Sequence, residues 1–243
     1  AAQSLNVGKP YEFERIWKSI DPKKHGKLFL TYGGEGSIRD EILNVFTEND
    51  KCAFEHYVAI WNFTKSKVEY IPFHNITHEQ TKQYIKGAIA MPLLSKGEII
   101  NGDRYLDGAF IDNIPAYPLL DKDLDYILCV YFDNHKYFFE TADFDKKIIK
   151  FFDFPNQRRL ETLGFNPSRF DEMVQYGYDY ALNTLRELFK NPEKDAVMAA
   201  IFEREKQMDR EYKPRLTVDV VLNNINVMTK KYIKRMTNIA KAD

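Results

Sequence analysis

The segment from Tyr126 to Phe132 constrains the fold most, because every one of its residues is apolar or aromatic. A near-continuous run of this kind is typical of a strand that is buried on both faces of a sheet. Such a strand needs other layers above and below it. We therefore expect a sheet with helices on both sides.

Other segments predict the remaining strands and helices. The alternating pattern of 54–63 and the β-branched and aromatic run of 68–73 predict two strands, and only the short segment 64–67 separates them. These strands should pair as an antiparallel hairpin. Short strands are expected at Glu98–Asn101 and Arg104–Leu106, joined by Gly102-Asp103. Apolar residues at helical spacing, some with a capping residue such as Thr77, predict helices at Pro10–Ile20, Ser37–Phe46, Thr77–Ala90, Ser168–Lys190, Pro192–Met208 and Thr217–Ala240.

The order of these elements predicts an α/β chain whose last part is rich in helix. We expect an α/β core in residues 1–135, an aromatic-rich cap or rim segment in 136–167, and a helical region packing on the core in 168–243. No internal repeat or flexible linker separates independently folding domains.

Charge and cysteine content exclude several classes of protein. The chain has 35 basic and 36 acidic residues, so no general attraction for nucleic acid is expected. No apolar stretch approaches the roughly 18 to 20 residues of a spanning helix, which favours the cytoplasm, and residues 1–6 do not have the pattern of a signal peptide. Because Ala1–Asn6 has no initiator Met, we read the chain as a fragment. Cys52 and Cys129 are expected to be packed thiols rather than a disulfide or zinc site.

The sequence contains neither a strong metal motif nor a standard nucleophile motif. His74 and His78 have a spacing of four residues, but they fall across a strand end and a helix start, so packed or solvated histidines are favoured over a metal site. We expect no metal and no cofactor. None of the serines lies in Gly-x-Ser-x-Gly. The glycine-rich run 33–37 lacks the Lys-Ser/Thr of a phosphate-binding loop, so a turn with Ser37 as helix cap is favoured.

The most informative segment is Asp107-Gly108-Ala109, which follows a short strand. Loops at the ends of strands often carry functional groups on a rigid scaffold. From these residues alone Asp107 is more typical of an Asx turn than of a catalyst, because Asp-Gly is a common turn dipeptide.

The surrounding motifs resemble those of the patatin-like phospholipases. That family has a stretch of small residues with Ala-Ile-Pro at a helix end, then a short hairpin, then Tyr-x-Asp-Gly-(Gly/Ala) followed by Asn-x-Pro. This chain shows Gly87-Ala88-Ile89-Ala90-Met91-Pro92, Arg104-Tyr105-Leu106-Asp107-Gly108-Ala109 and Asn113-Ile114-Pro115 in the same order. The resemblance covers residues 1–190 and is carried by the joint spacing of these motifs more than by Asp-Gly alone.

The resemblance implies a three-layer α/β/α fold, incomplete in this chain, and a serine acyl hydrolase of the phospholipase A or lipid esterase type. Asp107 would be the base of a Ser-Asp dyad, with Gly108 and Ala109 forming the close turn and Asn113 and Pro115 bracing the loop. In the family's order the serine and the glycine-rich oxyanion loop precede residue 1, so the chain alone is expected to be inactive. The alternative is a relative without the serine that binds lipid or protein and does not catalyse.

Aromatic residues alternate with lysines in the segment 136–154, which suits an interfacial element of a lipid hydrolase. The expected lipid contacts are Phe138, Phe139, Phe151 and Phe152, and the expected partners are a lipid or ester substrate and, transiently, a membrane surface. The alternative is that these aromatics pack onto the sheet while the lysines are solvated. The sequence does not determine an oligomeric state.

Overall fold

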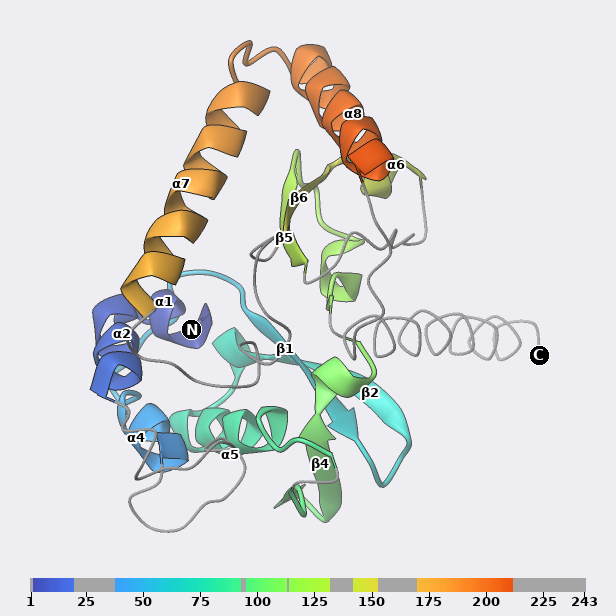
Figure 1. The fold of residues 1–243 in the computed structure, drawn as a ribbon. Helices are drawn as coiled ribbons and strands as arrows, with labels where there is room; N and C mark the ends of the chain where they lie inside the picture. The colour runs from blue at the N-terminus through green and yellow to red at the C-terminus, as the bar shows by residue number, and fades with distance from the viewer. Residues whose placement is uncertain are drawn as a thin grey trace, which may run out of the picture. The chain divides into compact units, whose positions relative to one another are not determined.

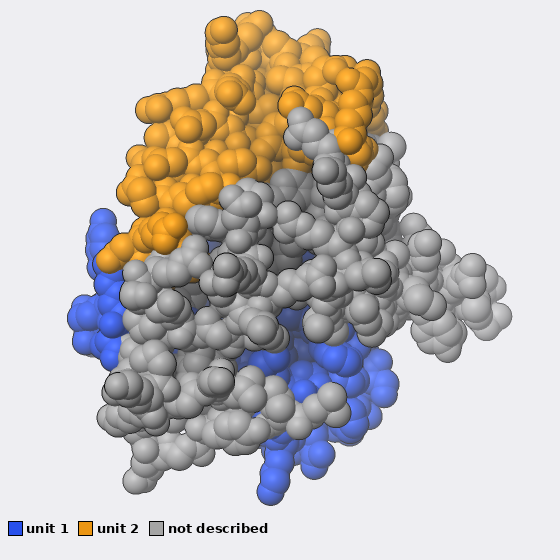
Figure 2. Space-filling model, in the orientation of Figure 1, with its two compact units in different colours: residues 1–115, 159–167 blue, residues 116–158, 168–243 orange. Residues whose placement is uncertain are grey.

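A computed structural model of the chain describes residues 2–19, 38–92, 95–112, 114–131, 142–152 and 170–211. The chain divides into two compact units, coloured separately in Figure 2. Unit 1 comprises residues 1–115 and 159–167, and unit 2 comprises 116–158 and 168–243. The mixed α/β content agrees with the prediction. The units divide after residue 115, whereas the sequence placed the end of the α/β core at residue 135.

Unit 1 contains a four-stranded antiparallel sheet with the strand order β2-β1-β4-β3 (Figure 1). The predicted hairpin is confirmed, with Val58 opposite Ile71 and Asn62 opposite Lys67. The strands are β1 (Tyr57–Asn62), β2 (Lys67–Pro72), β3 (Glu98–Ile100) and β4 (Asp103–Asp107).

The turn between β3 and β4 differs from the prediction by one residue. It is formed by Asn101 and Gly102, with φ values of 52° and 86°, so that Asp103 pairs with Ile100. Asn-Gly favours a two-residue hairpin turn in which both residues have positive φ, and the turn therefore falls at this dipeptide.

Helix α5 (His78–Ala88) packs against the sheet of unit 1 (Figure 1). The predicted cap is confirmed, because the Thr77 hydroxyl accepts from the Gln80 N–H and the Gln80 side chain accepts from the Thr77 N–H. At Gly87 an added Cβ would lie only 2.7 Å from Cδ1 of Ile60, so glycine allows the helix to approach β1 closely. The side chains packed at this contact are Ile60, Ile71, Tyr84, Ala88, Ile100 and Tyr105.

The remaining described helices of unit 1 form a second, smaller core. They are α1 (Ala2–Asn6), α2 (Pro10–Ser19) and α4 (Ile38–Asn44). Ile16 of α2 is buried against Ile42, Val45 and Phe46, and the helical spacing predicts the burial of Ile16, Ile42 and Phe46. Two short 3-10 turns, η1 (Phe73–Asn75) and η2 (Gly108–Phe110), complete the described part of this unit.

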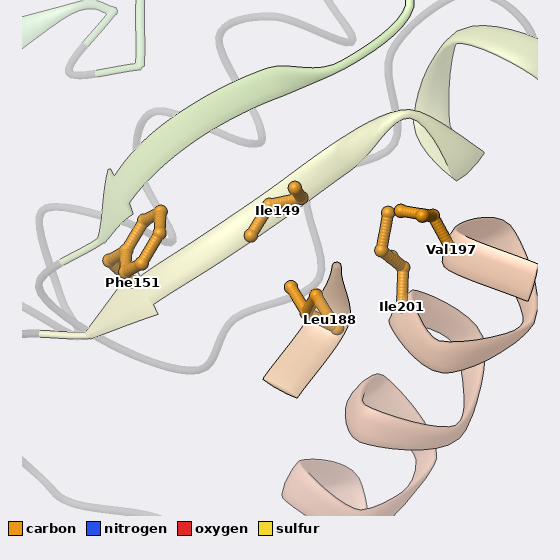
Figure 3. Close-up of a cluster of buried hydrophobic side chains, with 5 residues drawn as sticks. All are labelled: Ile149, Phe151, Leu188, Val197 and Ile201. Carbon is orange, nitrogen blue, oxygen red and sulfur yellow. The ribbon is translucent and has the colours of Figure 1, made fainter. Parts of the chain in front are cut away.

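Unit 2 contains a parallel pair of strands, β5 (Ile127–Tyr131) and β6 (Ile148–Phe152). Helices α7 (Phe170–Leu188) and α8 (Lys194–Glu211) pack on β6, while η3 (Tyr117–Leu119) and α6 (Ala142–Lys146) lie before each strand in the chain. Figure 3 shows a cluster of buried side chains in this unit, formed by Ile149, Phe151, Leu188, Val197 and Ile201.

The strand predicted from Tyr126 to Phe132 is confirmed as β5, but its burial on both faces is wrong. Ile127 and Cys129 are buried, whereas Leu128 is 58% and Val130 69% exposed. Leu128 and Val130 lie opposite Ile149 and Phe151 of β6, on the face where α7 and α8 pack. These helices cover β6 and leave that face of β5 exposed, so β6 is the strand buried on both faces. The described strands also form two sheets instead of the single sheet that we expected.

Candidate functional site

Asp107 is the last residue of β4, where the strand leaves the sheet. Its backbone pairs with Ile60 of β1, and its N–H donates to the carbonyl of Ala90 at 2.9 Å. The half-buried carboxylate accepts a hydrogen bond from the Ala109 N–H, also at 2.9 Å, and so caps η2. The Asx-type turn expected from the Asp-Gly dipeptide is therefore present. Among the described residues, the Asp107 carboxylate has no other hydrogen-bond partner and no ion-pair partner.

The environment of Asp107 raises its pKa. Burial disfavours the charged carboxylate, and the Ala109 N–H offsets this effect only in part, so the pKa lies above its ordinary value. No described cation compensates the charge. A carboxylate in this state takes up a proton more readily than an exposed aspartate, as a general base must.

Gly108 is required by the close approach of β1. A Cβ at this position would lie 2.4 Å from the carbonyl oxygen of Ala59 and 2.7 Å from the backbone nitrogen of Ile60. Both contacts are with backbone, which cannot move aside as a flexible side chain can. Gly108 therefore lets the loop turn directly over β1, and the neighbouring Ala109 is exposed.

Two side chains beyond the turn fix the loop to the sheet. The ring of Phe110 stacks on Trp61 of β1, with ring centroids 5.8 Å apart and planes inclined by 13°. Asp112 is 3% exposed, and the hydroxyl of Tyr70 on β2 donates to its carboxylate. From the sequence we expect Asn113 and Pro115 to brace the loop. Pro115 is exposed and Asn113 lies outside the described residues; among the described residues, the anchors are Phe110 and Asp112.

None of the serines that the structure describes is hydrogen-bonded to Asp107. The hydroxyl of Ser4 donates to the carbonyl of Lys9, and that of Ser19 donates to Ile16 at 2.8 Å. The hydroxyl of Ser95 accepts from the Gly97 N–H at 3.1 Å. Ser66 is exposed in the turn between β1 and β2, while Ser37 and Ser168 lie outside the described residues.

The described residues contain no group of three or more His, Cys, Asp or Glu side chains that could hold a metal ion. Nδ1 of His74 accepts from the backbone N–H of His56 at 3.2 Å. Burial lowers the pKa of His56 to about 4, so its ring is neutral near pH 7. Among the described helices, none combines the length and apolar character needed to cross a membrane.

The predicted lipid-contacting aromatics have different environments. Phe151 is 8% exposed and packs in the core of unit 2, edge-on to Tyr180. It is therefore a core residue, as in the alternative that we considered for this segment. The side chain of Phe152, at the end of β6, is not among those described, and Phe138 and Phe139 lie outside the described residues.

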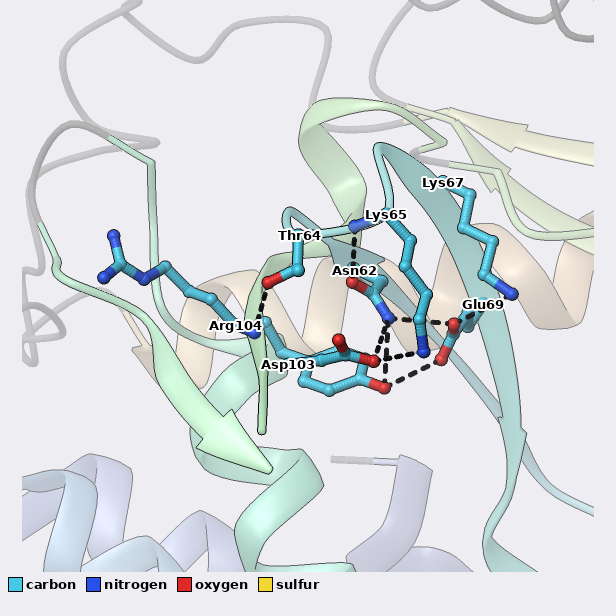
Figure 4. Close-up of polar contacts among 8 residues, drawn as sticks. Asn62, Thr64, Lys65, Lys67, Glu69, Asp103 and Arg104 are labelled. Atoms are coloured by element: carbon cyan, nitrogen blue, oxygen red, sulfur yellow. Dashed lines mark hydrogen bonds and ion pairs between the residues drawn. The ribbon is translucent and has the colours of Figure 1, made fainter. Parts of the chain in front are cut away.

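A second polar cluster lies at the β1–β2 turn of unit 1 (Figure 4). Its centre is Asn62, which is fully buried and donates to Glu69, Asp103 and Tyr105 at 3.0 to 3.2 Å. Lys65 pairs with Asp103, and Lys67 pairs with Glu69 at 3.1 Å. Each carboxylate here has a cation and at least one further hydrogen-bond donor, whereas Asp107 has no cation among the described residues. This cluster is therefore a satisfied network that holds the hairpin to β4.

No protein-family model matches this chain, and searches of curated proteins and of solved structures give no match either. The resemblance to patatin-like phospholipases thus rests on the motifs alone. The structural features that bear on function are the Asp107 carboxylate and the loop that holds it.

Proposed function

We propose that this chain provides the base of a serine ester hydrolase that acts on phospholipids or other lipid esters, with Asp107 as the catalytic carboxylate. One observation carries the proposal: the half-buried carboxylate has a raised pKa, and only one hydrogen bond, from the Ala109 N–H, supports it within the described residues. The motif resemblance supports the same assignment. We also propose that the chain is part of a three-layer α/β/α fold, in which helices cover both faces of a sheet, as the resemblance implies.

In the proposed reaction, Asp107 accepts the proton of a serine hydroxyl as its oxygen attacks the carbonyl carbon of the ester. The tetrahedral intermediate carries its negative charge on the former carbonyl oxygen, where backbone N–H groups stabilise it. The intermediate collapses, the C–O bond to the alcohol breaks, and protonated Asp107 returns the proton to the departing alcohol. Water, deprotonated by Asp107 in the same way, then attacks the acyl carbon. The bond from this carbon to the serine oxygen breaks, the acid is released, and protonated Asp107 returns the proton to the serine.

The properties of Asp107 suit this role. The Ala109 N–H fixes one carboxylate oxygen, so the other keeps a defined direction. The shift moves the pKa of the carboxylate toward neutral pH, and a pKa closer to neutral makes proton transfer in both directions more efficient. If Asp107 served only to form the turn, its side chain would need neither a negative charge nor a half-buried position.

Two substitutions separate catalysis from turn formation. Asp107→Asn retains an oxygen that can accept from the Ala109 N–H but cannot take up the proton, whereas Asp107→Ala removes both functions. Both variants are expected to lower the kcat for a p-nitrophenyl ester by about 10²- to 10⁴-fold, measured in the protein at its full natural length. Near-normal hydrolysis by a folded Asp107→Asn variant shows that the residue only shapes the turn.

The same experiment tests the alternative, in which the protein binds lipid or protein and has no catalytic activity. In that case the unsubstituted protein at full natural length does not hydrolyse esters, and the two Asp107 variants bind liposomes as it does. Measuring liposome binding beside ester turnover therefore distinguishes the two functions.

A further inference from the structure

We propose that Asp112 is a positioning residue, which holds in place the loop that presents the Asp107 carboxylate. This inference rests on the proposed function of Asp107. No sequence motif marks Asp112, and its role comes from the contacts that the fold brings to it.

Asp112 is the more deeply buried of the two carboxylates in this loop. Only 3% of its surface is exposed, and burying a carboxylate is costly unless donors surround it. The hydroxyl of Tyr70 donates to one of its oxygens, and the backbone N–H of Ile114 donates to the other at 3.3 Å. These bonds fix the side chain in one orientation.

The bond from Tyr70 ties the loop across the sheet. Tyr70 lies on β2, and β1 separates β2 from β4, the strand that ends at Asp107. The chain therefore leaves β4, turns over β1 at Gly108 and is held at β2 through Asp112. Stacking of Phe110 on Trp61 supports the loop between these points.

A displacement of Asp112 reaches Asp107 through the backbone. The N–H of Asp112 donates to the carbonyl of Gly108 at 2.8 Å, and Gly108 follows Asp107 directly. If Asp112 loses its anchor, this bond and the Asp107–Ala109 bond lose support together. A misplacement of about 1 Å in a catalytic group can lower the rate by about 10²-fold.

The test compares Tyr70→Phe, Asp112→Ala and Asp112→Asn in the protein at full natural length. Tyr70→Phe and Asp112→Ala are expected to lower the kcat for a p-nitrophenyl ester by about 10- to 100-fold, with KM changed less than about twofold. Asp112→Asn keeps an acceptor for the Ile114 N–H and a polar partner for Tyr70, so it should recover part of the loss. If Asp112→Ala fails to fold, Tyr70→Phe still tests the proposal, because it removes the hydroxyl that donates to Asp112.

A second readout is independent of activity. Hydrogen exchange of the Ala109 amide reports how firmly Asp107 is held, because this amide donates to its carboxylate. Tyr70→Phe should accelerate this exchange by about tenfold or more, while the amides of α5 exchange as before.

Tyr105→Phe is the matched control, because it also removes a tyrosine hydroxyl that donates to a carboxylate, at 3.0 Å to Glu69, outside the loop. It should affect neither the Ala109 amide nor kcat to a comparable degree. Unchanged Ala109 exchange in Tyr70→Phe overturns the proposal, as does a kcat no lower than that of Tyr105→Phe. Failure of the dyad itself gives a different result: Asp107→Asn is fully active while Tyr70→Phe still accelerates Ala109 exchange.

Discussion

At the scale of single residues, Asp107 should reduce the stability of the fold near neutral pH. Its folded-state pKa lies above the value of about 3.9 for an unfolded chain. Below pH 3.9 both states are protonated and the residue carries no cost. As the pH rises through the raised pKa, the cost of burying the charge develops in full. Asp107→Asn should therefore unfold at an equal or higher temperature than the unsubstituted chain at pH 7, and the difference should shrink toward pH 4.

Asp50 provides a control of opposite sign. Burial opposes its ionisation, but hydrogen bonds from Lys9 and Thr47 outweigh burial and lower its pKa. Its contribution to stability is present above the unfolded-state pKa and is lost as the pH falls through the lowered value. Asp50→Asn should thus lower the unfolding temperature at pH 7. If Asp107→Asn is destabilised at pH 7 as Asp50→Asn is, Asp107 has a structural role that the hydrogen bond from the Ala109 N–H does not explain.

At the scale of elements, the position of η2 over β1 depends on the missing side chain of Gly108. Gly108→Ala places a Cβ against the backbone of Ala59, and one of the two segments must shift. Overpacking of this kind costs about 1 to 3 kcal/mol, which urea unfolding measures directly. Ala109→Gly, at the exposed neighbouring position, should cost under about 1 kcal/mol. Equal effects of the two substitutions would mean that the loop yields easily at Gly108.

The elements that the sequence predicted well are those specified by local signals. The β1–β2 hairpin follows from alternation over a few residues, and α5 follows from the Thr77–Gln80 capping box. The β3–β4 turn was misplaced by one residue because the Asn-Gly signal was assigned to Gly102-Asp103. Which strand is buried on both faces depends on where α7 and α8 pack, and no local pattern encodes that. Asp107 could be found from its motif, whereas the partner of Asp112, Tyr70, is 42 residues away in sequence.

At the scale of the whole molecule, the proposed base needs a nucleophile that the described residues do not bring to it. The described serines make other contacts or lie in an exposed turn, and none is hydrogen-bonded to Asp107. A carboxylate without a hydroxyl to deprotonate and without oxyanion donors cannot transfer an acyl group. If the serine and the oxyanion donors precede residue 1, as the motif resemblance implies, residues 1–243 on their own should show no turnover of a p-nitrophenyl ester above the Asp107→Ala background. The protein at its full natural length should show clear turnover in the same assay. Turnover by residues 1–243 alone would place the nucleophile within this chain, and Ser37, in the glycine-rich segment before α4, is the first serine to substitute.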